Sequence, residues 1–356
     1  MQIIPGYLIK ETLRTFAIVL VAAISIYMVV DFFEKIDDLV EAGVSFSDAV
    51  MFFIFKVPLI VAQVTPVAVL LAVLIVIGLM ARNNELVVLQ ASGISSYYIT
   101  KPLLVLGLVL SLFLFFFSEI IVPIALAKAN DIWKIKVDRQ VATYKQKNIW
   151  IKSHRAIYHI AYFNPARETI SGASFYHFDD KFNIAMRLDA KSGTYRDGQW
   201  ILRDCLEQIR LEDGSYRITS LPERRVQIDL DPQSLKKVVK KSEEMSFNEL
   251  ATYIKKVKDE GYDVTPYEVD WQAKLAFPAV CLIMALAGTA IALRNKRGEG
   301  LGMGITYGIG TAFAYWTLYS FCLSLGYHGV VGPLVSAWLA NVLFILLSGI
   351  VLLWTG

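Results

Sequence analysis

"RNNELVVLQASGISSYYITK" (residues 82–101) separates two apolar segments, 57–81 and 102–118, that are each close to the length that crosses a membrane. A connection this short should be polar if only water contacts it. Instead, the four apolar residues 86–89 follow a single acid, Glu85. The pattern predicts a short apolar element that packs against another protein or against lipid headgroups.

The composition indicates a polytopic membrane protein. The chain has 356 residues, of which 55% are hydrophobic. A membrane-spanning helix needs about 20 apolar residues. No small-residue cleavage site follows Val30, so the first apolar segment is expected to be a retained helix rather than a signal peptide. Six transmembrane helices are therefore expected, at residues 15–30, 57–81, 102–118, 275–293, 301–327 and 329–354.

The basic residues of the short loops predict the orientation. Seven lie on one side of the membrane: Lys10, Arg14, Arg82, Lys101, Arg294, Lys296 and Arg297. Two, Lys35 and Lys56, lie on the other side. The side with seven should be cytoplasmic, which places both termini inside and the long insert outside. Ile9, Leu13 and Phe16 have helical spacing, which predicts a short amphipathic helix on the cytoplasmic surface before the first span.

The insert has a different pattern from the rest of the chain. Short β-rich runs such as "AIYHIAYF" and "GQWILRDCLEQIRL" are separated by turn signals such as Asp197-Gly198. A capping box, Ser246 with Glu249, then begins a connecting helix for which Gly261 is the expected stop. The expected fold is a membrane α-helical protein with an inserted all-β, jelly-roll-like periplasmic domain. Its parts are residues 1–123, 124–268 and 269–356.

The sequence contains no recognisable catalytic site. It lacks a Walker A motif, so this chain is not expected to hydrolyse nucleotide itself. No histidine spacing fits a zinc site, so neither a metal site nor a cofactor is expected. Cys205 is the only cysteine of the insert, which excludes a disulfide within it.

Gly300, Gly304 and Gly308 repeat every four residues in "GEGLGMGITYG" (residues 298–308), where the fifth apolar segment begins. Such a stripe lets another helix approach closely, and packing is its ordinary explanation. The functional alternative is a seam along this helix that can open sideways.

The loop between the second and third apolar segments resembles a known signature. "MARNNELVVLQASGIS" (residues 80–95) is similar to the signature of the lipopolysaccharide-export permeases of the LptF/LptG family. "DFFEKIDDLVEAG" (residues 31–43) resembles the same family, and its LptG type more than its LptF type. The plan of three helices, an external β-domain and three helices is a third similarity, so the resemblance covers essentially the whole chain.

The resemblance implies a set of partners. The loop would be a coupling helix at about residues 84–93 that docks on a cytoplasmic LptB-type ATPase dimer, which would bind ATP and Mg²⁺. The other partners would be an LptF-type permease, an LptC-type periplasmic bridge and lipopolysaccharide, with no nucleic acid. The expected coupling residues are Glu85, Leu86, Val88, Leu89 and Gly93. Asn83 or Asn84 is expected to cap this helix, and Gly93 to end it.

Lipid phosphates require cations near the outer headgroup level. The candidates are Lys35, Lys56, Lys128, Lys134 and Lys136, although anchoring at the membrane surface would also explain them. The inward side chains of the β-domain could continue an apolar path for the lipid or could be an ordinary core. They are Tyr158, Ile160, Phe175, Ile184, Met186 and Trp200.

Two other functional classes stay open from the residues alone. One is a permease of another envelope-lipid or lipoprotein exporter, although that class typically has four helices with its large domain after the first. The other is a non-transporting assembly scaffold, which would not need a coupling element. An enzyme is disfavoured because no catalytic site is recognisable.

Overall fold

The computed structural model shows two compact units. One unit comprises Met1–Trp133 and Lys241–Gly356, and the other Lys134–Lys240. The sequence predicted boundaries at residues 123/124 and 268/269, which would put the connecting helix with the β-domain. In the structure this helix belongs to the first unit, with the long apolar helices. The structure describes residues 3–133, 137, 146–153, 155–164, 168–179, 182–196, 199–211, 214–226, 242–259, 263–294 and 301–355.

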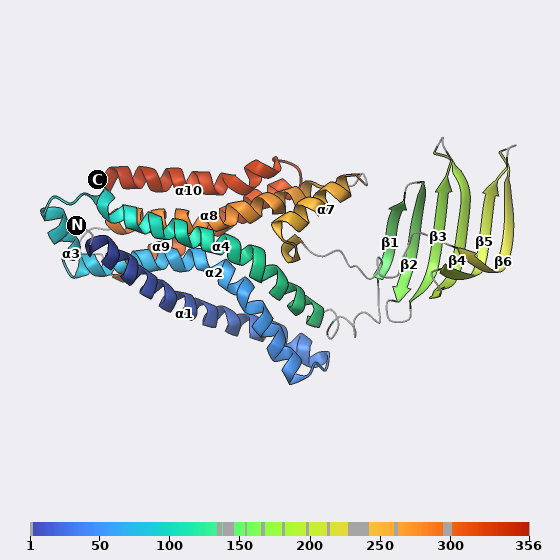
Figure 1. Cartoon of the computed structure of the whole chain (residues 1–356), viewed down its shortest axis with the longest axis horizontal. Helices are drawn as coiled ribbons and strands as arrows, with labels where there is room; N and C mark the ends of the chain where they lie inside the picture. Colours follow the sequence, from blue (N-terminus) through green and yellow to red (C-terminus); the bar gives the residue numbers. More distant parts are fainter. Residues whose placement is uncertain are drawn as a thin grey trace. The chain divides into compact units, whose positions relative to one another are not determined.

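The first unit is a bundle of long helices with shorter ones at its ends (Figure 1). Its N-terminal half contains α1 (Ile3–Glu41), α2 (Phe46–Arg82), α3 (Glu85–Ala91) and α4 (Ser96–Ile132). Its C-terminal half contains η2 (Ser242–Glu244), α7 (Phe247–Asp259), α8 (Thr265–Arg294), α9 (Leu301–Tyr327) and α10 (Pro333–Thr355).

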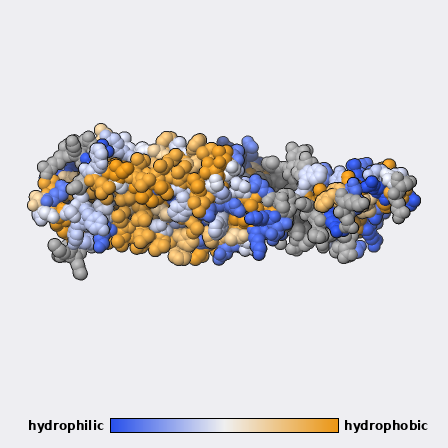
Figure 2. Space-filling model, turned by 90° about the horizontal axis from the view of Figure 1, so that it is seen from above, coloured by the Kyte–Doolittle hydropathy of each residue, from blue (hydrophilic) through white to orange (hydrophobic). Residues whose placement is uncertain are grey.

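Five of the described helices are long and apolar enough to cross a membrane: α1, α2, α4, α8 and α10. Figure 2 shows hydrophobic side chains gathered over the middle of the helical unit, with hydrophilic ones toward its ends. The sixth predicted span corresponds to α9, which has 27 residues and would be about 40 Å long. Glycine, threonine and tyrosine are frequent in α9, which is not one of these five helices.

Two helices form the centre of the bundle. In α2 and α8, 61% and 67% of the most apolar stretch is buried, against 11% in α1. Small residues allow this close packing. A Cβ added at Gly107 of α4 would lie 2.7 Å from the Cβ of Ala285, and one at Gly288 of α8 would lie 3.1 Å from the carbonyl oxygen of Leu70.

The N-terminal segment differs from the prediction of a separate surface helix. α1 runs unbroken from Ile3 to Glu41, because its only proline and glycine, Pro5 and Gly6, lie in the first turn. Ile9 and Phe16 pack against a buried cluster, whereas Leu13 is 47% exposed. The prediction of a separate surface helix was wrong, because this segment continues into the first span as one helix.

The second unit contains one antiparallel sheet with strands in chain order (Figure 1). The strands are β1 (Gln146–Ser153), β2 (Ala156–Asn164), β3 (Thr169–Phe178), β4 (Ile184–Arg196), β5 (Gln199–Arg210) and β6 (Tyr216–Val226). A jelly roll has two sheets, and the described strands form one meander. Of the predicted inward residues, Tyr158, Ile160, Phe175 and Trp200 are core, whereas Met186 is half-buried and Ile184 is 37% exposed.

The connecting helix begins as predicted. The amide of Glu249 donates to Ser246 Oγ at 3.3 Å, and the amide of Ser246 donates to Glu249 Oε2 at 3.0 Å. These reciprocal hydrogen bonds define the capping box of α7 and confirm it. The predicted stop, Gly261, lies outside the described residues.

Candidate functional site

The loop of the opening stretch forms a tight helical turn at one end of the bundle. α2 ends at Arg82, and α3 begins three residues later at Glu85. Asn84 holds the N-cap position with φ 61°, a left-handed conformation that asparagine tolerates, and makes no side-chain cap hydrogen bond. The prediction of a side-chain cap was wrong for Asn84 because a capping side chain requires an extended backbone at the N-cap position, and Asn84 is left-handed.

The other end of α3 agrees with the sequence. Gly93 has φ +80°, its amide donates to the carbonyl of Gln90 at 3.0 Å, and the amide of Ile94 donates to that of Leu89 at 3.1 Å. This pair of hydrogen bonds is a Schellman motif, which requires the left-handed conformation that glycine adopts without steric cost. Gly93 therefore ends the helix as predicted.

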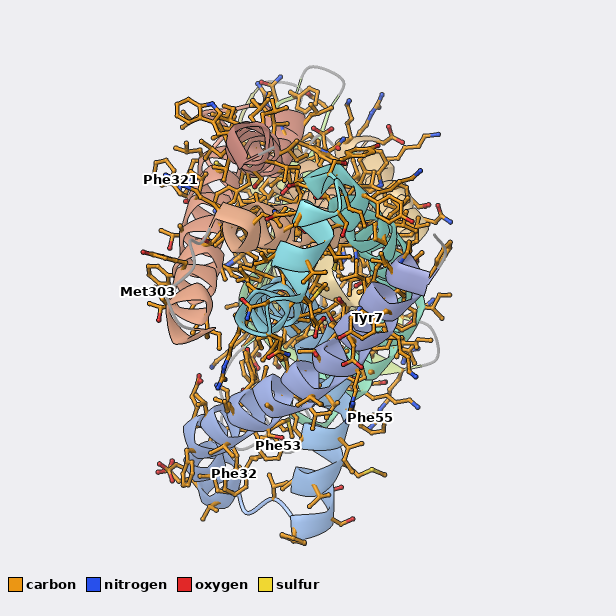
Figure 3. The ribbon with its side chains drawn as sticks, turned by 90° about the vertical axis from the view of Figure 1, so that its left-hand side faces the viewer. Tyr7, Phe32, Phe53, Phe55, Met303 and Phe321 are labelled. Carbon is orange, nitrogen blue, oxygen red and sulfur yellow. The ribbon has the colours of Figure 1, made fainter. Side chains whose placement is uncertain are left out.

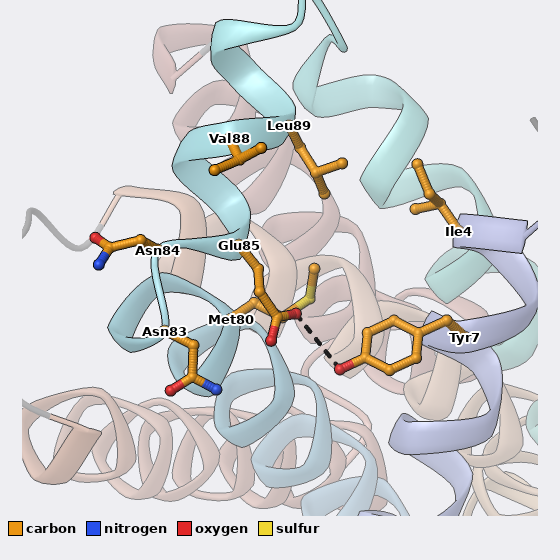
Figure 4. A pocket seen from close by; sticks show the side chains of 8 residues that line it. All are labelled: Ile4, Tyr7, Met80, Asn83, Asn84, Glu85, Val88 and Leu89. Carbon is orange, nitrogen blue, oxygen red and sulfur yellow. Dashed lines mark hydrogen bonds between the residues drawn. The ribbon is translucent and has the colours of Figure 1, made fainter.

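A pocket lies beside α3 (Figure 4). Its volume is about 410 Å³, and its apolar walls come from the N-terminal turns of α1, the end of α2 and α3. Two polar groups meet there: the Tyr7 hydroxyl donates a hydrogen bond to Glu85 Oε2 at 3.4 Å. The lining residues are Ile4, Tyr7, Met80, Asn83, Asn84, Glu85, Val88 and Leu89.

The predicted apolar coupling residues face in different directions. Leu86 is 8% exposed and belongs to the buried core of the bundle, together with Leu8 and Met80. Leu89 is half-buried against the same core. Val88 is 62% exposed. A partner seated on α3 can therefore contact Val88 and the edge of Leu89, whereas Leu86 packs α3 against the core of the helical bundle.

The Glu85 carboxylate has no cationic partner among the described residues. It is half-exposed, and no lysine or arginine of the described chain lies within 4.0 Å of it. Arg82, the closest in sequence, is exposed at the end of α2. A half-exposed carboxylate over apolar walls can accept a cation that another molecule supplies.

The predicted phosphate-binding lysines have different environments. Lys56 of α2 forms an ion pair with Asp31 of α1, and only 19% and 7% of their side chains are exposed. The ammonium group of Lys35 lies 5.4 Å from the ring centroid of Trp133 and 3.5 Å from the Glu34 carboxylate. Lys128 is exposed, and its ammonium group lies 5.3 Å from the ring centroid of Phe55. Lys134 and Lys136 lie outside the described residues. Lys56 is thus neutralised within the chain, and Lys35 and Lys128 are the described cations nearer to solvent.

A polar network joins α7 to α4 and α8, and sequence reasoning did not find it. Glu119 of α4 accepts the backbone N–H of Phe247 at 2.5 Å and lies 3.8 Å from Lys274 of α8. Asn130 donates to buried Glu244 at 2.6 Å. The sequence places such groups near the outer end of the bundle but gives no signal for their pairing across 114 to 155 residues.

The glycine stripe is described in part. Gly308 is buried, and a Cβ there would press on the side chains of Leu71 and Leu74 of α2. This contact explains Gly308 by helix packing within the chain. Gly304 is half-buried, and Gly300 lies outside the described residues.

The comparison with known families decides between the functional classes. The family model described as "Lipopolysaccharide export system permease LptF/LptG" matches residues 6–354, which is nearly the whole chain. The chain belongs to the LptF/LptG family. It is a membrane permease of lipopolysaccharide export, which the resemblance of residues 80–95 had indicated.

Similar curated proteins agree with this assignment. The lipopolysaccharide export system permease protein LptG of Escherichia coli (strain K12) is 22% identical over 97% of this chain and 96% of its own length. The LptG protein of Haemophilus influenzae is 22% identical over 88% of this chain and 87% of its own length. These similarities support a multi-pass inner-membrane protein and a transport subunit rather than an enzyme.

Proposed function

We propose that this chain is an LptG-type permease subunit of an ATP-driven ABC transporter. The transporter extracts lipopolysaccharide from the inner membrane and passes it to periplasmic partners for export to the outer membrane. The observation that carries the proposal is α3, which presents exposed Val88 and a Glu85 carboxylate with no lysine or arginine of the described residues beside it, next to an apolar pocket. Such a surface suits a cytoplasmic ATPase subunit of the LptB type, which supplies the basic side chain and binds ATP and Mg²⁺.

The physical nature of the substrate supports an energy-driven, enclosed route. A lipid with about 70 acyl methylenes, at about 0.8 kcal/mol each, costs on the order of 50 kcal/mol to expose to water. The lipid therefore needs apolar surroundings from the membrane to its acceptor. A bundle of this chain and a homologous LptF-type permease encloses it in the membrane, and an LptC-type bridge receives it beyond the periplasmic β-domain.

The sixth crossing is part of the proposal. Figure 1 shows both chain termini and α3 at the same end of the helical unit. Termini at one end require an even number of crossings, and α9 adds the sixth to the five most apolar helices. That end is cytoplasmic by the distribution of basic residues.

The exposed apolar faces of α1 and α9 suit the partner permease. Phe32 and Phe33 of α1 are 41% and 70% exposed, and Met303 and Phe321 of α9 are 47% and 61% exposed. Figure 3 shows Met303 and Phe321 pointing away from the bundle. A seam between such faces can open sideways to admit a lipid from the bilayer.

Glu85→Ala tests the coupling role. Removing one member of an interfacial charge pair costs about 2–5 kcal/mol, and the low end is roughly a thirtyfold loss of affinity. We expect the ATPase subunit to dissociate during purification and export in cells to fall. Glu85→Gln should be milder because it keeps the shape and an acceptor. Normal ATPase retention and export in Glu85→Ala would contradict the proposal.

A further inference from the structure

The N-terminal turns of α1 support α3, although the two segments are about 80 residues apart in the sequence. Leu8 of α1 is fully buried and belongs to the same core cluster as Leu86 of α3. Ile4 and Leu89 pack against this cluster from the two helices. α3 is therefore seated on α1 as well as on the end of α2.

A hydrogen bond joins the same two helices at the surface. Tyr7 Oη donates to Glu85 Oε2 at 3.4 Å, and both side chains line the pocket (Figure 4). This distance is longer than the roughly 2.7 Å that an O–H···O bond prefers, so the contact can tighten when either helix moves slightly. A carboxylate offers about four lone-pair sites, so the hydroxyl leaves room for a cation on the same group.

The rest of the pocket complements a long basic side chain. Ile4, Met80 and Val88 provide apolar wall beside the carboxylate. Arginine and lysine bury aliphatic stems along such walls while their charged ends seek an acceptor. No lysine or arginine of the described residues lies within 4.0 Å of Glu85, so a basic side chain of a partner would meet a carboxylate that these residues leave without a cation.

We propose that Tyr7 is a positioning residue that orients Glu85 for the basic side chain of the ATPase subunit. The docking surface then includes the first two turns of α1 together with α3. This inference rests on the proposed function, because it assumes that α3 contacts an ATPase. It adds α1 to the docking surface and gives the Tyr7 hydroxyl a role that depends on Glu85.

Tyr7→Phe tests the proposal because it removes the hydroxyl and keeps the ring. A half-exposed hydrogen bond to a charged group contributes modestly, so we expect the affinity of the purified permease complex for its ATPase subunit to fall about threefold. In the Glu85→Ala background the same change should alter affinity by less than about 1.5-fold, since the acceptor is gone. The titration has to reach concentrations at which a hundredfold loss is still measurable.

Tyr97→Phe is the matched control. Tyr97 lies near the start of α4, is 68% exposed and does not line the pocket, so its hydroxyl should be dispensable. Equal losses from Tyr7→Phe in both backgrounds, or no loss in either, would overturn the role of Tyr7. Unchanged affinity in Glu85→Ala would instead overturn the proposed function, so the two failures are distinguishable.

Discussion

At the scale of single residues, neighbours in α3 have different tasks. Leu86 and Val88 are two positions apart in a helix, so they point in different directions. The structure buries the first and exposes the second. The sequence groups both as one apolar seat, because "ELVVLQA" alone does not show which side α1 covers. That choice is made by Leu8 and Ile4, far away in the chain.

Truncation of these two residues should separate stability from coupling. Leu86→Ala leaves a cavity in the bundle core and should lower the free energy of unfolding by about 3 kcal/mol. Val88→Ala should leave the melting temperature unchanged and weaken ATPase binding about fivefold, since about 1 kcal/mol of apolar contact is lost. Thermal unfolding in detergent and ATPase titration measure the two effects. The reverse pattern would show that the helix faces the other way.

Lys56 offers a second test at this scale. Lys56→Met leaves the buried Asp31 carboxylate without its cation, which typically costs about 3–5 kcal/mol. We expect a large drop in melting temperature and recovery of most of it in Asp31→Asn with Lys56→Met. A substrate role would give a different result: stability would hold and crosslinking of lipopolysaccharide to the permease would weaken.

At the scale of elements, features set by neighbouring residues were mostly predicted correctly, apart from the side-chain cap at Asn84, whereas pairings between distant residues were not predicted. The capping box of α7 and the stop at Gly93 follow from residues within four positions of each other. The ion pairs Asp31–Lys56 and Glu119–Lys274 join helices that the sequence places only roughly in depth. A periodic pattern identifies a helix, but the helix that lies beside it depends on packing across the whole bundle.

The sheet shows the same limit. Seven short β-rich runs predicted strands, and the described residues form six strands. Their arrangement into one meander could not be predicted, because it depends on which strands pair and in which register. Asp204 has φ +51° and faces Pro222 in the β5–β6 ladder, between the paired residues 203/223 and 205/221. This irregularity puts Leu202 and Cys205 on the same buried face. Simple alternation fails at that point, which is why both faces of β5 look mixed in the sequence.

The β-unit should lose stability in acid. His177 of β3 has a lowered pKa, because burial disfavours its charged form and the Arg224 guanidinium repels it. The unfolded chain then binds a proton at higher pH than the folded chain. The stability contributed by neutral His177 is full above its ordinary pKa of about 6.5 and declines as pH falls below it.

Hydrogen exchange of the β3 amides measures this effect. Protection in the full-length protein should decrease between pH 7.5 and pH 5 after correction for the intrinsic exchange rate. His177→Gln removes the titrating group and should reduce that decrease. An equal loss of protection in parent and variant would assign the acid sensitivity to other groups.

At the scale of the whole molecule, one chain combines a bundle of helices long enough to cross a membrane with a compact β-unit. The family pattern and the hydropathy of the sequence predicted this division, because each depends on composition over long stretches. The proposed sixth crossing is less evident from composition, since glycine and aromatic residues are frequent in α9. Gly308 shows a reason for this substitution: it lets α9 approach Leu71 and Leu74 of α2.

The membrane topology of the chain determines both whether α9 crosses the membrane and whether Glu85 can reach an ATPase. With six crossings, a reporter after Gly356 and one within residues 83–96 should both report the cytoplasm, and one near Asp180 should report the periplasm. If α9 failed to cross, the C-terminal reporter alone would change sides, because five crossings separate the two termini. If the loop reporter were periplasmic, Glu85 could not meet an ATPase at all. The three reporters together therefore test the sixth span independently of the coupling role of α3.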